Sequence, residues 1–403
     1  MTSRTGSPAV MLITATAGFA LNFWAWALLS PLGPLWRDQG NLGPISESDV
    51  ALLVAIPVIV GSLGRIIIGA MTDRFGGRLM FPLVSVVTVV PILYIGVFAQ
   101  TSLGAALIGG FFLGIAGTAF AIGVPFVNAW YPPQRRGLAT GVFGAGMGGT
   151  AISALTTVWL YTNLGSRAPF IITAVVLIVY AVISWLVLRE APSWQPATIP
   201  LMQRIRSNAF LPLTWQASIL YAVAFGGYVA FSVYLPAYLK TGYDLSPGDA
   251  AMRMAGFVVV AVILRPVGGW LSDKYGAIAV LATSFVIVAA GAALASTGLP
   301  VHTFGAVAFL SMAAALGAGS GAVFALIAQA AEPSRVGGIT GLVGAAGGLG
   351  GFVPPLLMGY IYGRTDSYMF GLLLLTIVAI GTLILTLTVV RATAVSARQH
   401  PGN

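Results

Sequence analysis

Gly69-Ala-Met-Thr-Asp73-Arg74-Phe-Gly76 returns two hundred residues later in the chain as Gly269-Trp-Leu-Ser-Asp273-Lys274-Tyr-Gly276. Each copy ends a long apolar run, and each run carries an arginine, Arg65 or Arg265, eight residues before the aspartate. Self-similarity at a fixed offset is typical of internally repeated architectures. The sequence therefore predicts two homologous halves.

The composition places these halves in a membrane. Of the 403 residues, 58% are hydrophobic and only 7% are charged, and the mean hydropathy is +0.95. Soluble domains are about 25% charged, so a soluble enzyme, a disordered chain and a nucleic-acid binder are excluded. Apolar runs of about 20 residues fit a hydrocarbon core of about 30 Å. We expect an all-α polytopic membrane protein with twelve transmembrane helices, at about 9–33, 47–71, 79–99, 104–127, 137–160, 168–189, 211–238, 248–272, 277–297, 303–328, 336–361 and 367–391.

A polar stretch from Glu190 to Phe210 with three prolines divides six spans from six. We therefore expect an N-terminal half at 1–190, a cytoplasmic linker at 191–210, a C-terminal half at 211–391 and a cytoplasmic tail at 392–403. A second repeated pair supports this division, because Gly137-Leu-Ala-Thr140-Gly141-Val-Phe-Gly144-Ala145 matches Gly337-Gly-Ile-Thr340-Gly341-Leu-Val-Gly344-Ala345. Two such six-helix halves resemble the major facilitator fold, whose substrate sites lie near the midplane between the halves.

The distribution of basic residues predicts the orientation. With both termini inside, the inner segments hold twelve basic residues and the outer loops hold five, which follows the positive-inside rule. The short loops suit a multi-pass protein of a bacterial inner membrane. The inner residues are Arg4, Arg74, Arg78, Arg135, Arg136, Arg189, Arg204, Arg206, Lys274, Arg335, Arg391 and Arg398, and the outer ones are Arg37, Arg167, Lys240, Arg253 and Arg364.

The repeated loops resemble the signature loop of the major facilitator superfamily in both halves. Glycines permit close helix approach and a tight turn, and the carboxylates can cap a helix or pair with a cation across an interface. We expect Asp73, Arg74, Asp273 and Lys274 to form a conformational latch that says little about the substrate.

The two arginines indicate the substrate. Arg65 and Arg265 lie about 12 Å deeper than the loop aspartates if the runs are helical, and a buried arginine in a membrane is a functional hypothesis by default. The alternative is that each side chain extends to the membrane interface. All ten acids fall in loops or at span ends, so the pair lacks a carboxylate partner. A planar oxyanion fits the forked guanidinium donors.

Two glycine-rich stretches, beginning near Gly114 and Gly317, are the third signal. Small residues let helices cross closely and slide, although helix packing alone is an alternative interpretation. The glycines expected to serve helix packing and gating are Gly117, Gly141, Gly144, Gly317, Gly341 and Gly344.

At these residues the chain resembles the nitrate/nitrite porter family of the major facilitator superfamily. The resemblance runs from Asn22-Phe-Trp-Ala-Trp26 to Pro354-Pro355. It implies that Arg65 and Arg265 bind the nitrate or nitrite and that a tyrosine of the seventh span donates a hydrogen bond to it. The matching tyrosine is Tyr221, and the phenylalanines that would flank the anion are Phe120 and Phe324.

Two positions depart from the family pattern. Well-known members carry an asparagine where this chain has Ala119, and another in the glycine motif that reads Gly146-Met147-Gly148 here. The departures bear on the preference between nitrate and nitrite more than on the class of anion. Hydroxyl groups that can compensate for the missing amides are those of Thr118, Thr150 and Ser320.

These observations predict a secondary transporter that works by alternating access. An empty site with two cations is costly to move through a closed intermediate, and arginine keeps its proton, so nitrate/nitrite antiport is favoured over the alternative of proton-coupled nitrate symport. Another small anion, such as a short carboxylate, is an alternative substrate, and a non-transporting sensor is an alternative class. The chain has no cysteine and no catalytic or metal-binding motif, so we expect no enzyme activity and no cofactor. The resemblance also implies a monomer.

Overall fold

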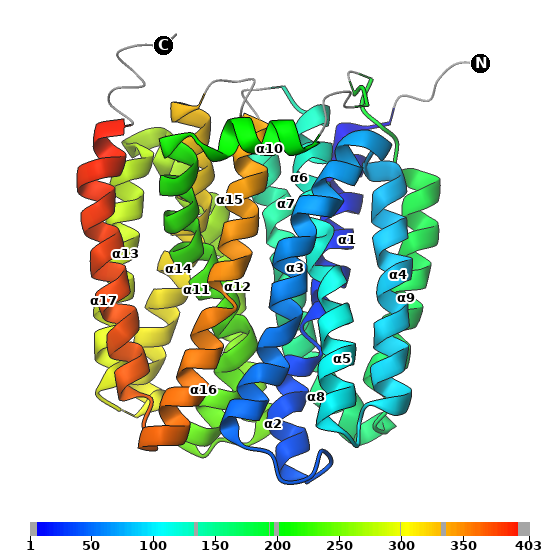
Figure 1. The fold of residues 1–403 in the computed structure, drawn as a ribbon, viewed down its shortest axis with the longest axis vertical. Coiled ribbons are helices and arrows are strands. Elements are labelled where there is room, and N and C mark those ends of the chain that lie inside the picture. The colour runs from blue at the N-terminus through cyan, green and yellow to red at the C-terminus, as the bar shows by residue number, and fades with distance from the viewer. Residues whose placement is uncertain are drawn as a thin grey trace.

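The computed structural model describes residues 6–132, 136–192, 194–196, 201–298, 300–331 and 336–393. Within these residues the chain forms helices and no strands, and most helices run side by side along one bundle axis (Figure 1). Twelve helical segments are long and apolar enough to cross a membrane, which confirms the predicted fold class. Arg4, Arg135, Arg335, Arg398 and most of the predicted tail lie outside the described residues.

The N half consists of the first six spans. Its helices are α1 (Pro8–Trp26), α2 (Leu29–Asp38), α3 (Glu47–Phe75), α4 (Gly77–Phe98), α5 (Leu103–Leu113), the 3₁₀ turn η1 (Gly114–Thr118), α6 (Ala119–Trp130), α7 (Arg136–Gly144), the 3₁₀ turn η3 (Ala145–Gly148), α8 (Gly149–Leu164) and α9 (Ala168–Val187).

The C half consists of the last six spans and follows the short helix α10 (Leu201–Ala209). Its helices are α11 (Pro212–Tyr243), α12 (Pro247–Tyr275), α13 (Ala277–Ser296), the π turn η4 (Val301–Gly305), α14 (Ala306–Ala330), α15 (Val336–Gly350), α16 (Val353–Thr365), α17 (Met369–Leu385) and the π turn η5 (Thr386–Val390).

The internal repeat predicted from the sequence extends to the geometry of the helix ends. Helices α3 and α12 each have 29 residues and occupy positions two hundred residues apart. Each begins after a serine, Ser46 or Ser246, whose hydroxyl accepts the backbone N–H of an aspartate three residues later, at 3.2 and 3.1 Å. Each ends at a glycine with positive φ, 82° at Gly76 and 88° at Gly276, a conformation that favours glycine. The repeated signature motif therefore encodes the same turn in both halves.

The first and eleventh predicted spans are each broken into two helices near a proline. The first span is not one continuous helix, because α1 ends at Trp26 and α2 begins at Leu29. The ring of Pro31 would clash with the carbonyl of Ala27 in a continuous helix. The eleventh span breaks in the same way between α15 and α16, where Pro354 and Pro355 follow Gly351.

Two glycine-containing segments of the N half, Gly114–Thr118 and Ala145–Gly148, form the 3₁₀ turns η1 and η3 in mid-span. Both turns contact neighbouring helices at distances that only glycine allows. A Cβ on Gly114 of η1 would overlap the carbonyl oxygen of Pro57, and a Cβ on Gly149, just after η3, would overlap that of Ala20. Turn η1 lies beside Arg65 of α3 and turn η3 beside Arg265 of α12, so both shape the centre of the bundle.

Helix α10 lies across one end of the bundle, where α1 also begins, and α2 and α16 approach the opposite end (Figure 1). We call these the α10 end and the α2 end. Large apolar side chains are exposed along the outer helices, for example Val90 at 68% and Ile377 at 66%. Such a surface suits contact with lipid, because exposed apolar patches of this extent are rare on soluble monomers.

Candidate functional site

Arg65 of α3 and Arg265 of α12 come together at the centre of the bundle. They are 5% and 2% exposed, so neither side chain extends to the surface. The Arg65 Cζ lies 5.3 Å from the ring centre of Phe120 and 5.6 Å from that of Phe225. The Arg265 Cζ lies 5.7 and 5.3 Å from the same two rings. Two guanidinium groups from different halves therefore share one pair of aromatic faces, an attractive arrangement for cations.

Arg65 makes its hydrogen bonds to backbone carbonyl groups. Its Nε donates to Gly117 O of η1 at 3.3 Å, and its Nη1 donates to Gly344 O of α15 at 2.8 Å. The Arg65 guanidinium can approach the backbone of α15 closely because that helix has glycine there. A Cβ on Gly348 would lie 2.9 Å from the Arg65 Nη1. One on Gly344 would lie 3.3 Å from the Phe120 ring. Arg65 thus spans the boundary between the halves.

Arg265 makes its hydrogen bonds to side chains. Its Nη2 donates to the Tyr221 hydroxyl at 3.0 Å, and its Nη1 donates to the Met147 sulfur of η3 at 3.1 Å. A Cβ on Gly144 would lie 3.0 Å from the Arg265 Nε. The thioether belongs to the N half and is a weak acceptor. Met147 stands in a glycine motif already noted for its departure from the family pattern, but its contact with Arg265 was not predicted.

The aromatic residues predicted for the site lie around the arginines. Tyr221 packs against Phe324 with ring centres 4.9 Å apart, and Phe120 lies 6.4 Å from Phe324. Phe225 was not predicted as a site residue, although it stacks on Tyr221 at 4.9 Å and on Phe120 at 6.1 Å. Its position four residues after Tyr221 places both rings on one face of α11, and this spacing was the available signal.

No salt bridge found among the described residues includes Arg65 or Arg265. Their partners are carbonyl oxygens, a thioether and a hydroxyl, all of which are neutral. Two buried positive charges with neutral partners attract an anion, because a nearby opposite charge offsets the cost of burial. Over the described residues there is also no cluster of side chains suited to a metal ion.

The three hydroxyl groups considered as replacements for the missing amides bond elsewhere. Thr118 donates to Ile115 O at 2.6 Å and Ser320 donates to Leu316 O at 2.7 Å. Thr150 lies 3.0 Å from the Tyr228 hydroxyl, which in turn donates to Met147 O at 3.1 Å. These bonds hold the helices and η3 in place and do not include the arginines.

The remaining predicted glycines differ in how closely they are packed. A Cβ on Gly117 would lie 3.1 Å from the Trp26 Nε1, and a Cβ on Gly317 would overlap the Ala261 carbonyl oxygen. One on Gly141 would lie 3.6 Å from Pro266 of the other half, and one on Gly341 would meet nothing within 4 Å. Close helix crossing thus explains Gly117 and Gly317, but not Gly341.

The predicted latch residues lie at the C-terminal ends of α3 and α12, toward the α10 end. Arg74 and Lys274 are exposed. They lie over aromatic rings of their own helices, at 5.5 Å from the Phe75 ring and 5.1 Å from the Tyr275 ring. Asp273 is also exposed.

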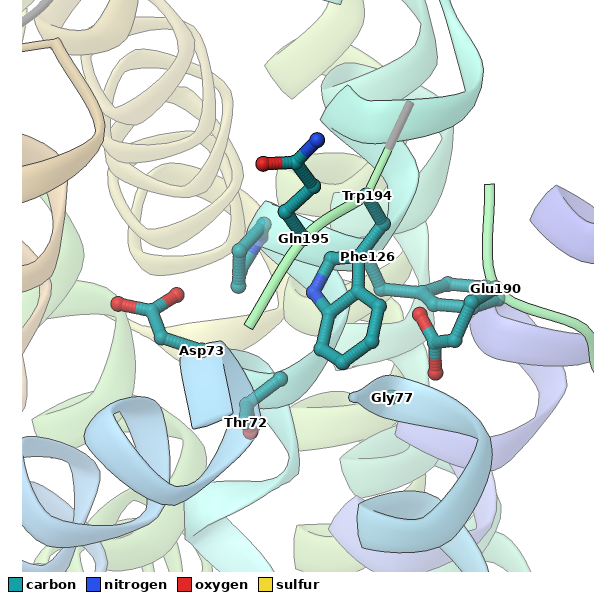
Figure 2. A pocket seen from close by; sticks show the side chains of 8 residues that line it. Thr72, Asp73, Gly77, Phe126, Glu190, Trp194 and Gln195 are labelled. Atoms are coloured by element: carbon teal, nitrogen blue, oxygen red, sulfur yellow. The ribbon is translucent and has the colours of Figure 1, made fainter. Parts of the chain in front are cut away.

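Asp73 lines a cavity of about 230 Å³ between the signature loop and the start of the linker (Figure 2). Glu190 borders this cavity and accepts the backbone N–H of Arg78 at 2.7 Å. A Cβ on Gly76 would overlap the Glu190 carboxylate, and burial raises the pKa of Glu190. Glu190 was predicted only as the first residue of the polar stretch between the halves, but its carboxylate bonds to the backbone that follows the signature loop.

Comparison with known proteins agrees with this geometry. The family model described as Major Facilitator Superfamily matches residues 15–257 and 217–402. Two solved structures share the fold at low identity. The bacterial homologue of the human lysosomal transporter Spinster has a TM-score of 0.69 at 18% identity and 97% coverage of both chains. The human organic anion transporter MFSD10 has a TM-score of 0.76 at 13% identity, covering 94% of this chain and 99% of that one.

Relatives identified by sequence place the chain more finely within the superfamily. The chain is 46% identical to the "Probable nitrate/nitrite transporter NarK2" of Mycobacterium tuberculosis, over 92% of this chain and 94% of that protein. It is 33% identical to the "Nitrite extrusion protein" of Bacillus subtilis, over 94% and 93%. It is 31% identical to the "Probable nitrate transporter NarT" of Staphylococcus epidermidis, over 88% and 90%. The chain therefore belongs to the Major Facilitator Superfamily and, within it, to the nitrate/nitrite porter family.

Proposed function

We propose that this protein carries nitrate and nitrite across the membrane and binds the anion between Arg65 and Arg265. The observation that supports the proposal best is the meeting of two buried guanidiniums, one from each half, on shared aromatic faces and, among the described residues, with neutral partners only. A guanidinium presents forked N–H donors that match a planar oxyanion. The names of the relatives, which include nitrate and nitrite transporters, agree with this substrate class.

Tyr221 supplies the third polar contact in this proposal. Its hydroxyl oxygen accepts from the Arg265 Nη2 at 3.0 Å. A hydroxyl that accepts one bond still has its own proton to donate, so the Tyr221 O–H can donate to the bound anion. Phe120 and Phe324 flank the anion and exclude water, which strengthens the charge interactions in the site.

The proposed mechanism is alternating access by rocking of two halves, residues 1–190 and 211–391, joined by the cytoplasmic linker 191–210. The bonds from Arg65 to Gly344 O and from Arg265 to the Met147 sulfur cross between these halves. An anion held by both arginines would likewise join the halves and then travel with the site as it opens to either side. Gly117, Gly141, Gly144, Gly317, Gly341 and Gly344 serve this movement as packing and gating positions, and Asp73, Arg74, Asp273 and Lys274 act as the latch.

We further propose that transport is nitrate/nitrite antiport. Two buried cations without an anion repel each other in a low-dielectric site, so the loaded carrier crosses more readily than the empty one. Both termini are cytoplasmic in this proposal, the membrane is a bacterial inner membrane, and the working unit is a monomer. The α2 end then faces outward.

Uptake of labelled nitrate into proteoliposomes tests the function. Vesicles are prepared empty or preloaded with nitrite, each with and without an inward proton gradient. Antiport predicts uptake that requires internal nitrite whether or not the gradient is present. Gradient-driven uptake into empty vesicles would replace antiport with proton symport. Absence of nitrate flux from folded protein would contradict the substrate, and labelled formate in the same vesicles then tests a short carboxylate.

A further inference from the structure

The carboxylate of Glu47, at the start of α3, is buried at the α2 end and accepts hydrogen bonds from four side chains. Glu47 is 8% exposed. Its Oε1 accepts from the hydroxyls of Tyr234 at 3.0 Å and Tyr368 at 3.2 Å. Its Oε2 accepts from Thr241 at 3.2 Å and pairs with Arg37. An ionised carboxylate only accepts hydrogen bonds and has about four lone-pair sites. The four donors therefore satisfy its full capacity to accept.

Three of the four donors come from the other half. Arg37 is on α2 of the N half, whereas Tyr234 and Thr241 are on α11 and Tyr368 directly precedes α17. The Glu47 carboxylate is therefore a point at which the two halves are joined at this end.

Further contacts at the α2 end also cross between the halves. The Lys240 Nζ lies 2.5 Å from the Asp38 Oδ1. Ser48 donates to Gly359 O at 3.2 Å, and the Arg37 Nη2 donates to the Thr241 hydroxyl at 3.0 Å. Any movement that opens the α2 end must break these bonds together with those of Glu47.

We propose that Glu47 is the proton-binding site of a gate at the α2 end, which the ionised carboxylate holds closed and a proton releases. Hydrogen bonds to an ionised acceptor are about twice as strong as those between neutral groups. A proton on Glu47 removes the charge that Arg37 pairs with and fills one acceptor site with a donor. In the closed arrangement, protonation therefore weakens all four interactions of the carboxylate. In an open arrangement only the interaction with Arg37 remains to be weakened, so protonation costs that arrangement less. By linkage, acidification favours opening.

The titratable and charged groups around Glu47 are tyrosines, two cations and two further carboxyls. The tyrosines are Tyr234 and Tyr368, which donate to Glu47, and Tyr238 and Tyr362, whose ring centres lie 4.6 and 4.4 Å from that of Tyr368. The cations are Arg37, which pairs with Glu47, and Lys240, which pairs with Asp38. The carboxyls near the gate are Glu47 itself, Asp38 in its pair with Lys240, and Asp49, which bonds to Ser46 on the exposed side.

The gate is separate from the proposed anion site. Glu47 and Arg65 are eighteen residues apart on α3, which is about 27 Å along the helix axis. The proposal of a gate therefore depends on the contacts at the α2 end and not on which anion is transported. It remains testable if the proposed substrate proves wrong.

The chain contains no cysteine, so two introduced cysteines can carry spin labels without background. Suitable sites are Gln39 after α2 and Thr365 at the end of α16, both exposed and in different halves. Double electron–electron resonance in lipid nanodiscs gives the distance between them. We expect one short distance at about pH 7.5 and a growing longer population as the pH falls through the carboxyl range toward about 4.5. Glu47→Gln should show the longer population at both pH values, with no further response to pH.

Two control variants isolate the carboxylate. Ser48→Ala removes a neutral bond between the halves and should retain the pH response, and His302→Gln should retain it although a titratable side chain is lost. The parent protein tests the proposal even if Glu47→Gln does not fold. A parent distance distribution that is the same at both pH values overturns it, and so does a pH response that persists in Glu47→Gln.

Discussion

The Arg65 Nη1 donates to the carbonyl oxygen of Gly344 at 2.8 Å, across the boundary between the two halves of the protein. Arg265 makes the reciprocal contact in chemically different form, because its partner across the boundary is the sulfur of Met147. The two halves thus place equivalent arginines at equivalent positions, but the atoms that accept hydrogen bonds from these arginines differ. Since an anion must compete with these partners for guanidinium N–H groups, the two arginines are not equivalent, and substitutions at the two positions are expected to differ in degree.

Replacement of either arginine by lysine tests the forked donor. Arg65→Lys and Arg265→Lys keep the positive charge but lose the planar fork, so each should weaken anion binding by about one charge-assisted hydrogen bond, about 1.5–3 kcal/mol or roughly 10- to 150-fold. Nitrate flux and the dissociation constant in detergent measure the effect. The matched control is Arg167→Lys at the exposed start of α9. Parent-like flux in either site variant would exclude that arginine from the proposed site.

Removal of one hydroxyl group tests the role of Tyr221. Tyr221→Phe keeps the stacking on Phe225 but removes the acceptor of the Arg265 Nη2 and the proposed donor to the anion. We expect binding to weaken by about 1.5–3 kcal/mol, the value of a hydrogen bond to a charged group. Tyr180→Phe is the control, since its hydroxyl donates to Thr14 O in α1, away from the arginines. Equal affinities in the two variants would mean that Tyr221 does not contact the anion.

The absence of a side chain at Gly144 leaves room for the Arg265 guanidinium in the site. A Cβ there would lie 3.0 Å from the Arg265 Nε and 3.2 Å from its Cζ, so Gly144→Ala must displace the guanidinium or η3. Overpacking of this kind costs about 1–3 kcal/mol, and we expect a corresponding loss of transport with retained folding. Gly256→Ala in α12 is the matched control, because a Cβ there meets nothing within 4 Å. A Gly144→Ala protein as active as this control would show that the site adapts to the methyl group.

The features that the sequence predicts correctly are those with a period or a repeat. The twelve spans follow from runs of apolar residues, and the offset of two hundred residues places Arg65 and Arg265 at equivalent depths in α3 and α12. The helix break before Pro31 was missed, although proline is a known local signal. The apolar run continued past it, and hydropathy alone does not register a break in the backbone.

The features that the sequence did not predict depend on contacts between distant segments. The bond from Arg65 to Gly344 O joins residues 279 positions apart and uses a backbone atom, which no residue pattern reports. The environment of Glu47 combines α2, α3, α11 and the start of α17. From the sequence, Glu47 is an acid at the edge of a span, and only the packing of the two halves buries it.

Stability as a function of pH tests the bond between the linker and the signature loop. Burial raises the pKa of Glu190 above its ordinary value even though the Arg78 N–H favours the ionised form. The folded protein thus holds this proton to higher pH than the unfolded chain does. Stability should therefore fall as the pH rises from about 4.3, the ordinary glutamate value, through the raised pKa.

Glu190→Gln stays neutral and can still accept the Arg78 N–H, so it should lack this pH-dependent loss and unfold at a higher temperature than the parent near neutral pH. Thermal unfolding in detergent at a series of pH values measures the difference. Asp366→Asn, at an exposed turn between α16 and α17, controls for the loss of one negative charge. If the parent and Glu190→Gln lose stability in parallel as the pH rises, the buried carboxyl of Glu190 is not the group whose ionisation opposes folding at this junction.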